Sequence, residues 1–335
     1  MFIPSVKPAV SAFDIFGRRK VNLNMYFKQN YYWTGSGSAA IYLAIKASGA
    51  KNIAIPAFTC SIVPDVVKKT EANVQYYDSG IVTTLSDIKK ALKKKPDMII
   101  LTYNFGLIPN DIEEIIMECR KRKVLVLEDC AHAFGFGQNA DFTIYSCGIA
   151  KSLSYYGGFL ISKKKLEVDS MSKLSFIKEA IFFGKGLFSS VVFNAKVYGF
   201  ISKIVFRTVD RHPKAKLYSI SLFAKNIILN QINRFTEIQN IRNRNFKVIS
   251  NLKNIVRTKQ KSNLYLVLQT KNREKVIRSF RKKNIEILPA KSFFNLAGKG
   301  FPKAKQAEKE HLIFSLYRPK KEMEVFINAA KKIKF

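Results

Sequence analysis

The stretch YSCGIAKSLSYYGGFLIS, residues 145–162, places a lysine between two short apolar runs. The first run ends at Ser146, Lys151 follows in the turn, and the second run begins after Gly157 and Gly158. Lysine is mostly an exposed residue, so Lys151 alone predicts only a solvated side chain. A lysine held between two strands is different, because a buried amine of lowered pKa can form a Schiff base with an aldehyde cofactor.

The same rhythm extends outward from this stretch, from about residue 31 to residue 163. Short apolar runs alternate with amphipathic stretches, which is typical of βα units around a mostly parallel sheet. A helix is expected over 39–48, begun by Ser36 and Ser38 and ended by Gly49, with another near 111–122. Strands are expected at 52–58, 74–78, 98–103, 124–129, 142–146 and 157–162.

The remainder of the chain divides by composition. Residues 163–260 are basic, rich in aromatics and poor in turn residues, which predicts several helices. The tail predicts a small α/β unit, with strands at 263–270 and 285–290 and helices at 273–283 and 320–333. We therefore expect an N-terminal arm (1–30), a large α/β domain (31–165), a helical basic segment (166–260) and a small C-terminal α/β domain (261–335).

The charge balance favours anionic partners. The chain has 58 Lys and Arg against 24 Asp and Glu, a formal charge of +34. Such a field attracts nucleotides, sugar diphosphates, nucleic acid or anionic lipid, although the lysines can equally form a solvated face. No nucleic-acid-reading motif is present, so we disfavour that partner. The spacing of the four cysteines and three histidines predicts neither a metal site nor a disulfide framework, and with no export signal apparent we expect a cytoplasmic protein.

Residues 176–206 interleave lysines with apolar side chains. One interpretation is a helix that lies against an anionic membrane or binds a sugar diphosphate. The other is a buried helical layer or a dimer interface. Because Lys196 and Lys203 interrupt the most apolar part, we do not expect a membrane-spanning helix.

Three further residues or pairs in the first half are candidates for a binding site. Gly37 and Ser38 come immediately before or at the start of a helix, where backbone N–H groups bind phosphate, or where they form only a cap. Asp129 ends the apolar run VLVLED, a position at the edge of a sheet where a buried carboxylate needs a cationic partner. A helix cap or a structural hydrogen bond is the alternative for Asp129, and a core position is the alternative for His132.

Taken together and in order, six segments resemble the DegT/DnrJ/EryC1/StrS family, which consists mainly of fold-type I pyridoxal-phosphate aminotransferases acting on nucleotide-linked keto sugars. The resemblance covers the first half strongly and extends to FPKAKQAEKEHLIFSLYRPKKEMEVFINAAKKI (301–333), which resembles the last helices of the family; the middle matches poorly. The six segments are GSGSAAIYLAI (35–45), NIAIPAFTCSIV (52–63), NVQYYD (73–78), TYNFGLIPND (102–111), VLVLEDCAHAFG (124–135) and YSCGIAKSLSYYGG (145–158).

The resemblance implies a role for each matching residue. Lys151 would be the catalytic Schiff-base lysine, which also moves a proton at the substrate carbon. Ser146 and the backbone of Gly37 and Ser38 would bind the phosphate of pyridoxal 5′-phosphate. Asp129 would pair with its ring nitrogen.

The chain also departs from the family. His132 replaces a frequent glutamine and keeps the ability to hydrogen-bond the ring hydroxyl. Cys60 replaces the aromatic residue that stacks on the cofactor, so that stacking is lost or comes from Phe58 or another ring. A motif that reaches the neighbouring subunit in the family is replaced by residues 217–219, Leu-Tyr-Ser.

The resemblance implies a homodimeric aminotransferase that takes an amino group from glutamate and delivers it to a nucleotide-linked keto sugar for surface polysaccharide or lipopolysaccharide synthesis. Retention of Lys151 supports this activity, because the family's sugar dehydratases have histidine at that position. The alternatives are another pyridoxal-phosphate reaction, or a non-catalytic protein of this fold that binds an anionic substrate or a membrane surface. Peripheral contact with the inner face of the membrane is part of that last alternative.

Overall fold

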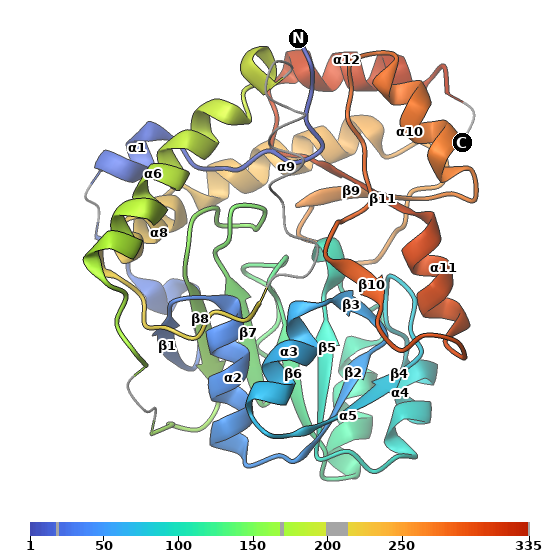
Figure 1. Ribbon diagram of the computed structural model, residues 1–335. Helices are drawn as coiled ribbons and strands as arrows, with labels where there is room; N and C mark the ends of the chain where they lie inside the picture. Colours follow the sequence, from blue (N-terminus) through green and yellow to red (C-terminus); the bar gives the residue numbers. More distant parts are fainter. Residues whose placement is uncertain (18–19, 168–170, 199–213, 334–335) are drawn as a thin grey trace.

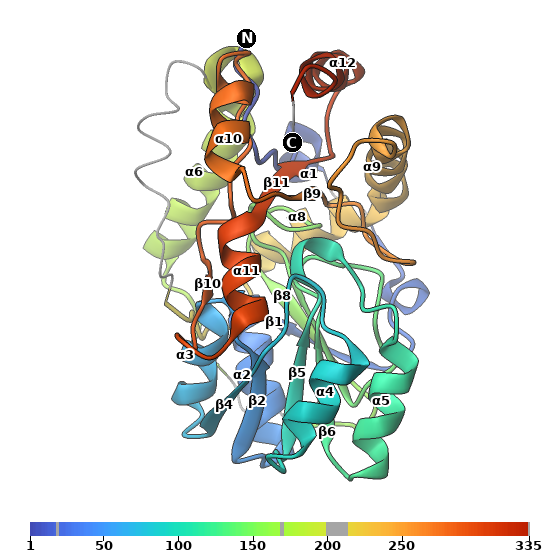
Figure 2. The same cartoon turned by 90° about the vertical axis from the view of Figure 1, so that its right-hand side faces the viewer.

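A computed structural model describes residues 1–17, 20–167, 171–198 and 214–333. Its lower half in Figure 1 is a seven-stranded sheet between helices, and its upper half holds a two-stranded sheet with the C-terminal helices. Figure 2, turned by 90°, shows the same two halves, with α11 and β10 lying between them.

The large sheet has the strand order β1-β8-β7-β6-β5-β2-β4. Strands β4, β2, β5, β6 and β7 pair in parallel, whereas β8 is antiparallel to both β7 and β1. The expectation of a mostly parallel central sheet is therefore confirmed. The strands are β1 (Asn30–Thr34), β2 (Asn52–Pro56), β4 (Asn73–Tyr77), β5 (Met98–Thr102), β6 (Leu125–Asp129), β7 (Phe142–Ser146) and β8 (Gly158–Ser162).

Helices cover both faces of this sheet, because its central strands alternate apolar side chains between two cores. Ile99 and Leu101 face one core, which is closed by α4 (Leu85–Leu92), α5 (Ile112–Lys121) and α8 (Leu222–Asn233). Met98 and Ile100 face the other, which is closed by α2 (Gly37–Ser48) and α3 (Ile62–Lys69). The result is a three-layer α/β sandwich.

The first of these helices, α2, begins and ends where its sequence predicts. The Ser36 side chain accepts a hydrogen bond from the N–H of Ala39 at 3.0 Å, which caps the N-terminus. Gly49 ends the helix at a φ of +69°, a left-handed conformation that glycine adopts without strain. This capping fixes the point at which the helix N-terminus faces the end of the sheet.

The upper half contains β9 (Tyr265–Gln269) and β11 (His311–Ser315), which pair antiparallel. A separate pair joins β10 (Phe293–Asn295) to β3 (Phe58–Cys60) of the lower half. The helices of this half are α10 (Arg273–Arg281), α11 (Pro302–Glu310) and α12 (Lys320–Ala330). The β3–β10 pair therefore links the large sheet to the C-terminal part of the chain.

The sequence predictions for several of these elements need correction. Residues 285–290 form no regular strand: Ile285 and Leu288 make isolated bridges only. The partner of β9 is instead β11. Strand β11 lies within residues 301–333, which were compared above with the last helices of the family. Strand β1, which lies at the sheet edge, was not predicted. The expected strand over 52–58 is divided between β2 and β3.

The middle of the chain is helical, as predicted, in the part that the structure describes. Helix α6 (Phe176–Val192) runs along the outside beside the short α1 (Ala12–Phe16), and α8 continues into α9 (Phe235–Ile249). Two short 3-10 turns are η1 (Leu23–Met25) and η2 (Asn104–Gly106). None of the described helices has the length and hydrophobicity that crossing a bilayer requires. The prediction for 176–206 also includes residues 199–206, which lie outside the described residues.

Candidate active site

The site lies at the carboxyl ends of β6 and β7, where parallel α/β sheets gather their functional groups. Asp129 is the last residue of β6 and Ser146 the last residue of β7. The N-terminus of α2 faces this edge, because a Cβ placed on Gly37 would lie only 2.7 Å from Ser146 Cβ. The chain then turns through Gly148 to Lys151, so the structure brings the predicted residues together.

Gly37, Ser38 and Ser146 form a corner suited to a phosphate. The first N–H groups of a helix have no acceptor within the helix, and they lie at its positive end. The Ser146 hydroxyl makes no hydrogen bond to any of the residues that the structure describes. A side chain at position 37 would fill the space beside Ser146, so glycine there keeps the corner open.

The segment before α8 crosses this corner. Ser38 Oγ accepts a hydrogen bond from the Lys216 N–H at 3.1 Å, and the Gly35 N–H donates to the Tyr218 carbonyl at 2.9 Å. The hydroxyl of Ser38 is thus engaged within the chain, which leaves its N–H for a ligand. Residues 217–219, compared above with an intersubunit motif, here follow a segment bonded to α2 of their own chain.

Lys151 meets His132 at the centre of the site. The Nζ of Lys151 lies 2.9 Å from Nε2 of His132, whose residue is 7% exposed. The chain between Asp129 and His132 forms turns and no helix. His132 is therefore positioned by the turns after β6 and by contacts from other segments.

The backbone of Phe105 determines which nitrogen of His132 carries the proton. Its N–H donates to Nδ1 of His132 at 3.1 Å, so Nδ1 is an acceptor. A neutral imidazole with an acceptor at Nδ1 carries its proton on Nε2. Nε2–H then donates to Lys151 Nζ, and an amine that accepts a hydrogen bond is unprotonated. The geometry holds Lys151 as the neutral, nucleophilic amine.

Electrostatics at the pair agree with this assignment. Burial lowers the pKa of Lys151, an effect that Cys60 and Asp129 oppose. Burial, together with the neighbouring Lys151, holds the pKa of His132 well below its usual value. Both groups are therefore driven toward their neutral forms, which is the protonation state that the hydrogen bonds require.

A strained turn supports His132. Phe105 adopts a φ of +59°, a left-handed conformation that non-glycine residues rarely adopt, and Gly106 follows at +87°. A Cβ on Gly106 would lie 2.0 Å from Ser262 Oγ, so only glycine fits. Ser262 and Ser152 both donate to the His132 carbonyl, at 2.7 and 3.2 Å. The histidine is held from three separate segments.

The carboxylates of Asp129 and its neighbour Glu128 differ in how many hydrogen bonds they accept. Glu128 is fully buried and accepts hydrogen bonds from the Tyr103 and Thr143 hydroxyls and from two backbone N–H groups. Asp129, 8% exposed, accepts one hydrogen bond among the described residues, from the N–H of Ala131 at 3.1 Å. Burial raises the pKa of Asp129, while Lys151 and that N–H oppose the rise. Glu128 is structural, whereas Asp129 retains capacity for a cationic partner.

An aromatic ring from β10 stands opposite Cys60. Phe293 pairs in register with Cys60 across β3 and β10, and its ring stacks on His132 with centroids 5.7 Å apart and planes 28° apart. Phe58 is fully buried behind it, in contact with Phe105 and Phe293. Phe293, which sequence reasoning did not name, therefore lies beside His132, as do Phe105 and Tyr265, whose ring centroids are each 6.0 Å from that of His132.

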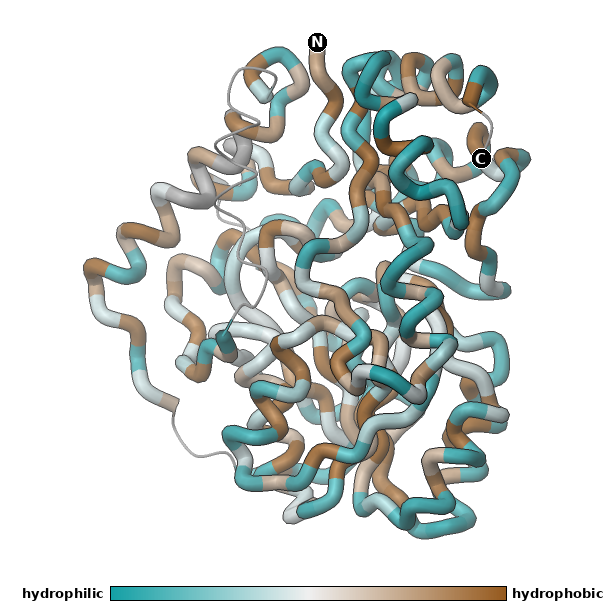
Figure 3. The backbone as a smooth tube through the Cα atoms, turned by 45° about the vertical axis from the view of Figure 1, so that its right-hand side comes forward, coloured by the Kyte–Doolittle hydropathy of each residue, from teal (hydrophilic) through white to brown (hydrophobic). Residues whose placement is uncertain are grey.

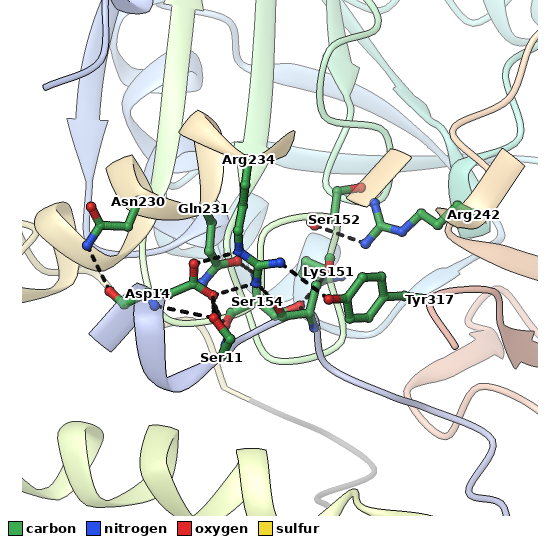
Figure 4. A network of polar contacts seen from close by, with 11 residues as sticks. Ser11, Asp14, Lys151, Ser152, Ser154, Asn230, Gln231, Arg234, Arg242 and Tyr317 are labelled. Carbon is green, nitrogen blue, oxygen red and sulfur yellow. Dashed lines mark hydrogen bonds and ion pairs between the residues drawn. The ribbon is translucent and has the colours of Figure 1, made fainter. Parts of the chain in front are cut away.

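The loop that carries Lys151 is clamped by side chains of the helical middle segment (Figure 4). Gln231 of α8 accepts from the Ser154 N–H at 2.7 Å and donates to the Ser154 carbonyl at 3.2 Å. Arg242 of α9, 1% exposed, donates to the Ser152 carbonyl at 3.0 Å. These residues were missed because no motif marks them; the available signal was a glutamine among the isoleucines of a helix.

The N-terminal arm closes the same network. Arg234 pairs with the fully buried Asp14 at 2.6 Å, and the Ala9 N–H donates to Ser154 Oγ at 3.0 Å (Figure 4). From the C-terminal side, the Tyr265 hydroxyl donates to the Ala150 carbonyl at 2.8 Å. Within the described residues no cluster of three or more His, Cys, Asp or Glu side chains could hold a metal ion.

Comparison with known proteins agrees with this site. The sequence profile of the DegT/DnrJ/EryC1/StrS aminotransferase family matches residues 22–174. These residues belong to that family. They include Asp129, His132, Ser146 and Lys151, and the family resemblance drawn from the sequence is confirmed.

Relatives of this DegT/DnrJ/EryC1/StrS segment are found among characterised and solved proteins. GDP-perosamine synthase of Escherichia coli O157:H7 is 28% identical over 149 residues, which are 42% of this chain and 40% of that protein. The putative sugar aminotransferase Spr1654 from Streptococcus pneumoniae, PMP-form, superposes with a TM-score of 0.70 at 16% identity over 99% of this chain and 98% of its own. AtS13 from Actinomadura melliaura gives 0.73 at 14% identity over 99% of each chain.

The two structural likenesses extend across the poorly matching middle and the C-terminal part. At such low identity they show the fold alone, which is that of fold-type I pyridoxal-phosphate transferases. The fold class predicted from the sequence is thus confirmed over nearly the whole chain.

Proposed function

We propose that this chain is a pyridoxal 5′-phosphate-dependent aminotransferase that converts a nucleotide-linked keto sugar into an amino sugar. The observation that carries the proposal is the contact of the Lys151 amine with His132 at 2.9 Å, in the electrostatic neighbourhood of Asp129, whose carboxylate accepts one hydrogen bond among the described residues. A buried amine and a buried carboxylate both cost stability, so their presence together at the end of a sheet favours a chemical role over a structural one.

The residues present fit this cofactor. The open corner at Gly37 and Ser146 suits a phosphate, and the spare hydrogen-bonding capacity of Asp129 suits a protonated ring nitrogen. His132 Nε2–H is a donor for the ring hydroxyl once Lys151 is engaged. Phe293, opposite Cys60, supplies an aromatic face. When bound, the cofactor supplies an electron-withdrawing ring that acidifies the adjacent substrate C–H bond.

The roles of the chain's own residues follow from their contacts. Lys151 would hold the cofactor through its amine nitrogen, with the aldehyde oxygen leaving as water, and would then move a proton at the substrate carbon. Asp129 keeps its ring-nitrogen partner protonated, because a buried carboxylate favours a cationic neighbour. Gln231 and Arg242 hold the backbone of the Lys151 loop, so the amine returns to one position after each transfer.

The substrate class rests on the family and on charge. The matched relative is named for GDP-perosamine, and the structural neighbour Spr1654 is named as a putative sugar aminotransferase. A formal charge of +34 raises the local concentration of an anionic sugar nucleotide. We further propose glutamate as amino donor, a homodimer, a cytoplasmic location and a role in surface polysaccharide or lipopolysaccharide synthesis, all implied by the family resemblance.

Cofactor attachment tests the first step of the proposal. The purified protein mixed with pyridoxal phosphate should develop a visible absorption band. Borohydride reduction followed by peptide mass spectrometry should find the cofactor on Lys151. Lys151→Ala is the control and should show neither the band nor the attachment. Attachment to a different lysine would overturn the assignment of Lys151.

Amino transfer tests the second step and separates the enzyme from its alternatives. Glutamate should bleach the band and release 2-oxoglutarate, and a nucleotide-linked keto sugar should restore it. Bleaching by amino acids with no response to any keto-sugar nucleotide would favour another pyridoxal-phosphate reaction. Failure to bind the cofactor at saturating concentration would favour a non-catalytic protein of this fold.

A further inference from the structure

The outer face of α6 exposes large apolar side chains. Phe176 is 85% exposed, Ile177 71%, Ile181 48% and Phe188 64%. Ile177, Ile181 and Phe188 are four and seven residues apart, so they share one face of the helix. Phe182 and Phe183 point the other way and contact Tyr156 and Phe223 of the protein body. The described part of α6 is therefore not a buried helical layer.

Neighbouring elements extend this surface. Helix α1 contacts both α6 and α8, and the three helices lie together at one side of the molecule (Figure 1). Phe16 of α1 is 73% exposed and Leu222, the first residue of α8, 82%. Figure 3 shows brown, hydrophobic stretches along α6 at the edge of the backbone trace. We call the exposed side chains of Phe13, Phe16, Phe176, Ile177, Ile181, Phe188 and Leu222 the apolar face.

Charge around the apolar face is positive. Lys173, Lys178 and Lys196 are exposed on the segment that contains α6. The acidic side chains described on these elements are not exposed. Glu179 is half-buried, and Asp14 is buried in its ion pair with Arg234. A surface that combines exposed large apolar residues with lysines and lacks an exposed acid is complementary to an anionic interface.

We propose that the apolar face rests on the surface of an anionic phospholipid bilayer, with α6 parallel to the membrane plane. The phenylalanines and isoleucines enter the boundary between headgroups and acyl chains, while the lysines contact lipid phosphates. Because none of the described helices is suited to crossing a bilayer, the contact is peripheral. This proposal goes beyond the proposed aminotransferase activity and does not depend on it.

A second copy of the chain fits the same face less well. A two-fold interface sets each patch against its own copy, which would bring the lysines of α6 near those of the partner. Like charges brought together at this face cost free energy. An anionic bilayer instead satisfies both the apolar residues and the charge.

Vesicle co-sedimentation of the full chain tests the apolar part of the contact. The protein should sediment with vesicles of phosphatidylglycerol and phosphatidylcholine but not with phosphatidylcholine alone. Ile177→Gln combined with Phe188→Gln should weaken binding at least about tenfold. Met117→Gln, which changes a 51% exposed residue on the distant α5, is the matched control and should bind like the wild type.

Charge variants test the lysines. Lys173→Glu combined with Lys178→Glu should weaken vesicle binding at least about tenfold, whereas Lys121→Glu on α5 should have a smaller effect. Raising salt from about 0.05 M to about 0.5 M should release the wild type, because it shortens the screening length. All of these positions are exposed, so unchanged melting temperatures should confirm that the variants fold.

Two outcomes would overturn the proposal. The first is wild-type binding to anionic vesicles by the Ile177 and Phe188 double variant, which would place the lipid contact elsewhere. The second is the absence of vesicle binding at low salt together with a dimer, measured by light scattering, that the same double variant dissociates. That result would assign the face to a second copy of the chain. Neither outcome depends on aminotransferase activity in solution. The membrane proposal and the proposed enzymatic function can therefore fail separately.

Discussion

Removing the imidazole of His132 should protonate Lys151. In His132→Ala, Nζ loses the Nε2–H donor that lies 2.9 Å away. A hydrogen bond of this kind contributes about 1 kcal/mol, which is about fivefold in an equilibrium. The water that fills the vacated space acts in the same direction, because burial is the main cause that lowers the pKa of Lys151. The ratio of neutral to protonated Lys151 should therefore fall at least about fivefold.

The assay follows the amine directly in cofactor-free protein. A small aldehyde and cyanoborohydride label lysines in proportion to their neutral fraction, and peptide mass spectrometry reads each lysine separately. At a pH below the Lys151 pKa of both proteins, Lys151 in His132→Ala should react about fivefold more slowly than in the wild type, and the two rates should converge at high pH, where both amines are neutral. His132→Gln should stay close to the wild type, because its amide N–H can replace the imidazole donor.

Two results would refute this reasoning. Equal labelling rates for wild type and His132→Ala at every pH would show that the imidazole does not stabilise the neutral amine. Nitrogen NMR that placed the proton of His132 on Nδ1 would contradict the tautomer inferred from the Phe105 N–H. Exposed Lys121, whose surroundings do not change, is the internal reference for the labelling rates.

Three further predictions concern stability and affinity. Lys151→Met should melt at a higher temperature than the wild type in cofactor-free thermal scans, because the folded-state pKa of Lys151 is lowered. The difference in stability between variant and wild type should grow as pH falls below about 10.4, the pKa of an unfolded-chain lysine, and should level off below the folded-state pKa. Asp129→Asn should keep or raise the melting temperature yet weaken cofactor binding at least about tenfold in a spectroscopic titration, since its charge is costly without a cationic partner. Asp14→Asn should lower the unfolding free energy in urea by about 3 kcal/mol by leaving the largely buried Arg234 unpaired, whereas Glu118→Gln, in a partly exposed i,i+4 ion pair, should cost under about 1 kcal/mol.

Local sequence signals predicted the parts of the fold that depend on local physics. The buried strands of the large sheet are short apolar runs, and α2 has a serine cap and a glycine end, so pattern and capping located them. Strand β1, NYYWT, is an edge strand that is only partly buried, and its pattern gave no clear alternation. Strand β11 follows α11 without a turn residue, so its boundary was not visible in the sequence.

Sequence reasoning identified only those site residues that belong to a recognisable motif. Asp129, His132, Ser146 and Lys151 were found because they follow strands at family spacings, although their roles stay predictions. Phe293 could not be found, because its place opposite Cys60 depends on a pairing between strands more than 200 residues apart in sequence.

The poorly matching middle of the chain is part of the site. The family profile ends at residue 174, yet Gln231 and Arg242 lie beyond it and bind the backbone on either side of Leu153, just after Lys151. A desolvated amine gains free energy by turning toward water, so it stays inside only if its loop is fixed. Backbone carbonyls and N–H groups of the loop provide that fixing, and side chains on α8 and α9 reach them. The middle can therefore diverge in most of its sequence while a few polar residues on the inner faces of its helices keep Lys151 beside His132.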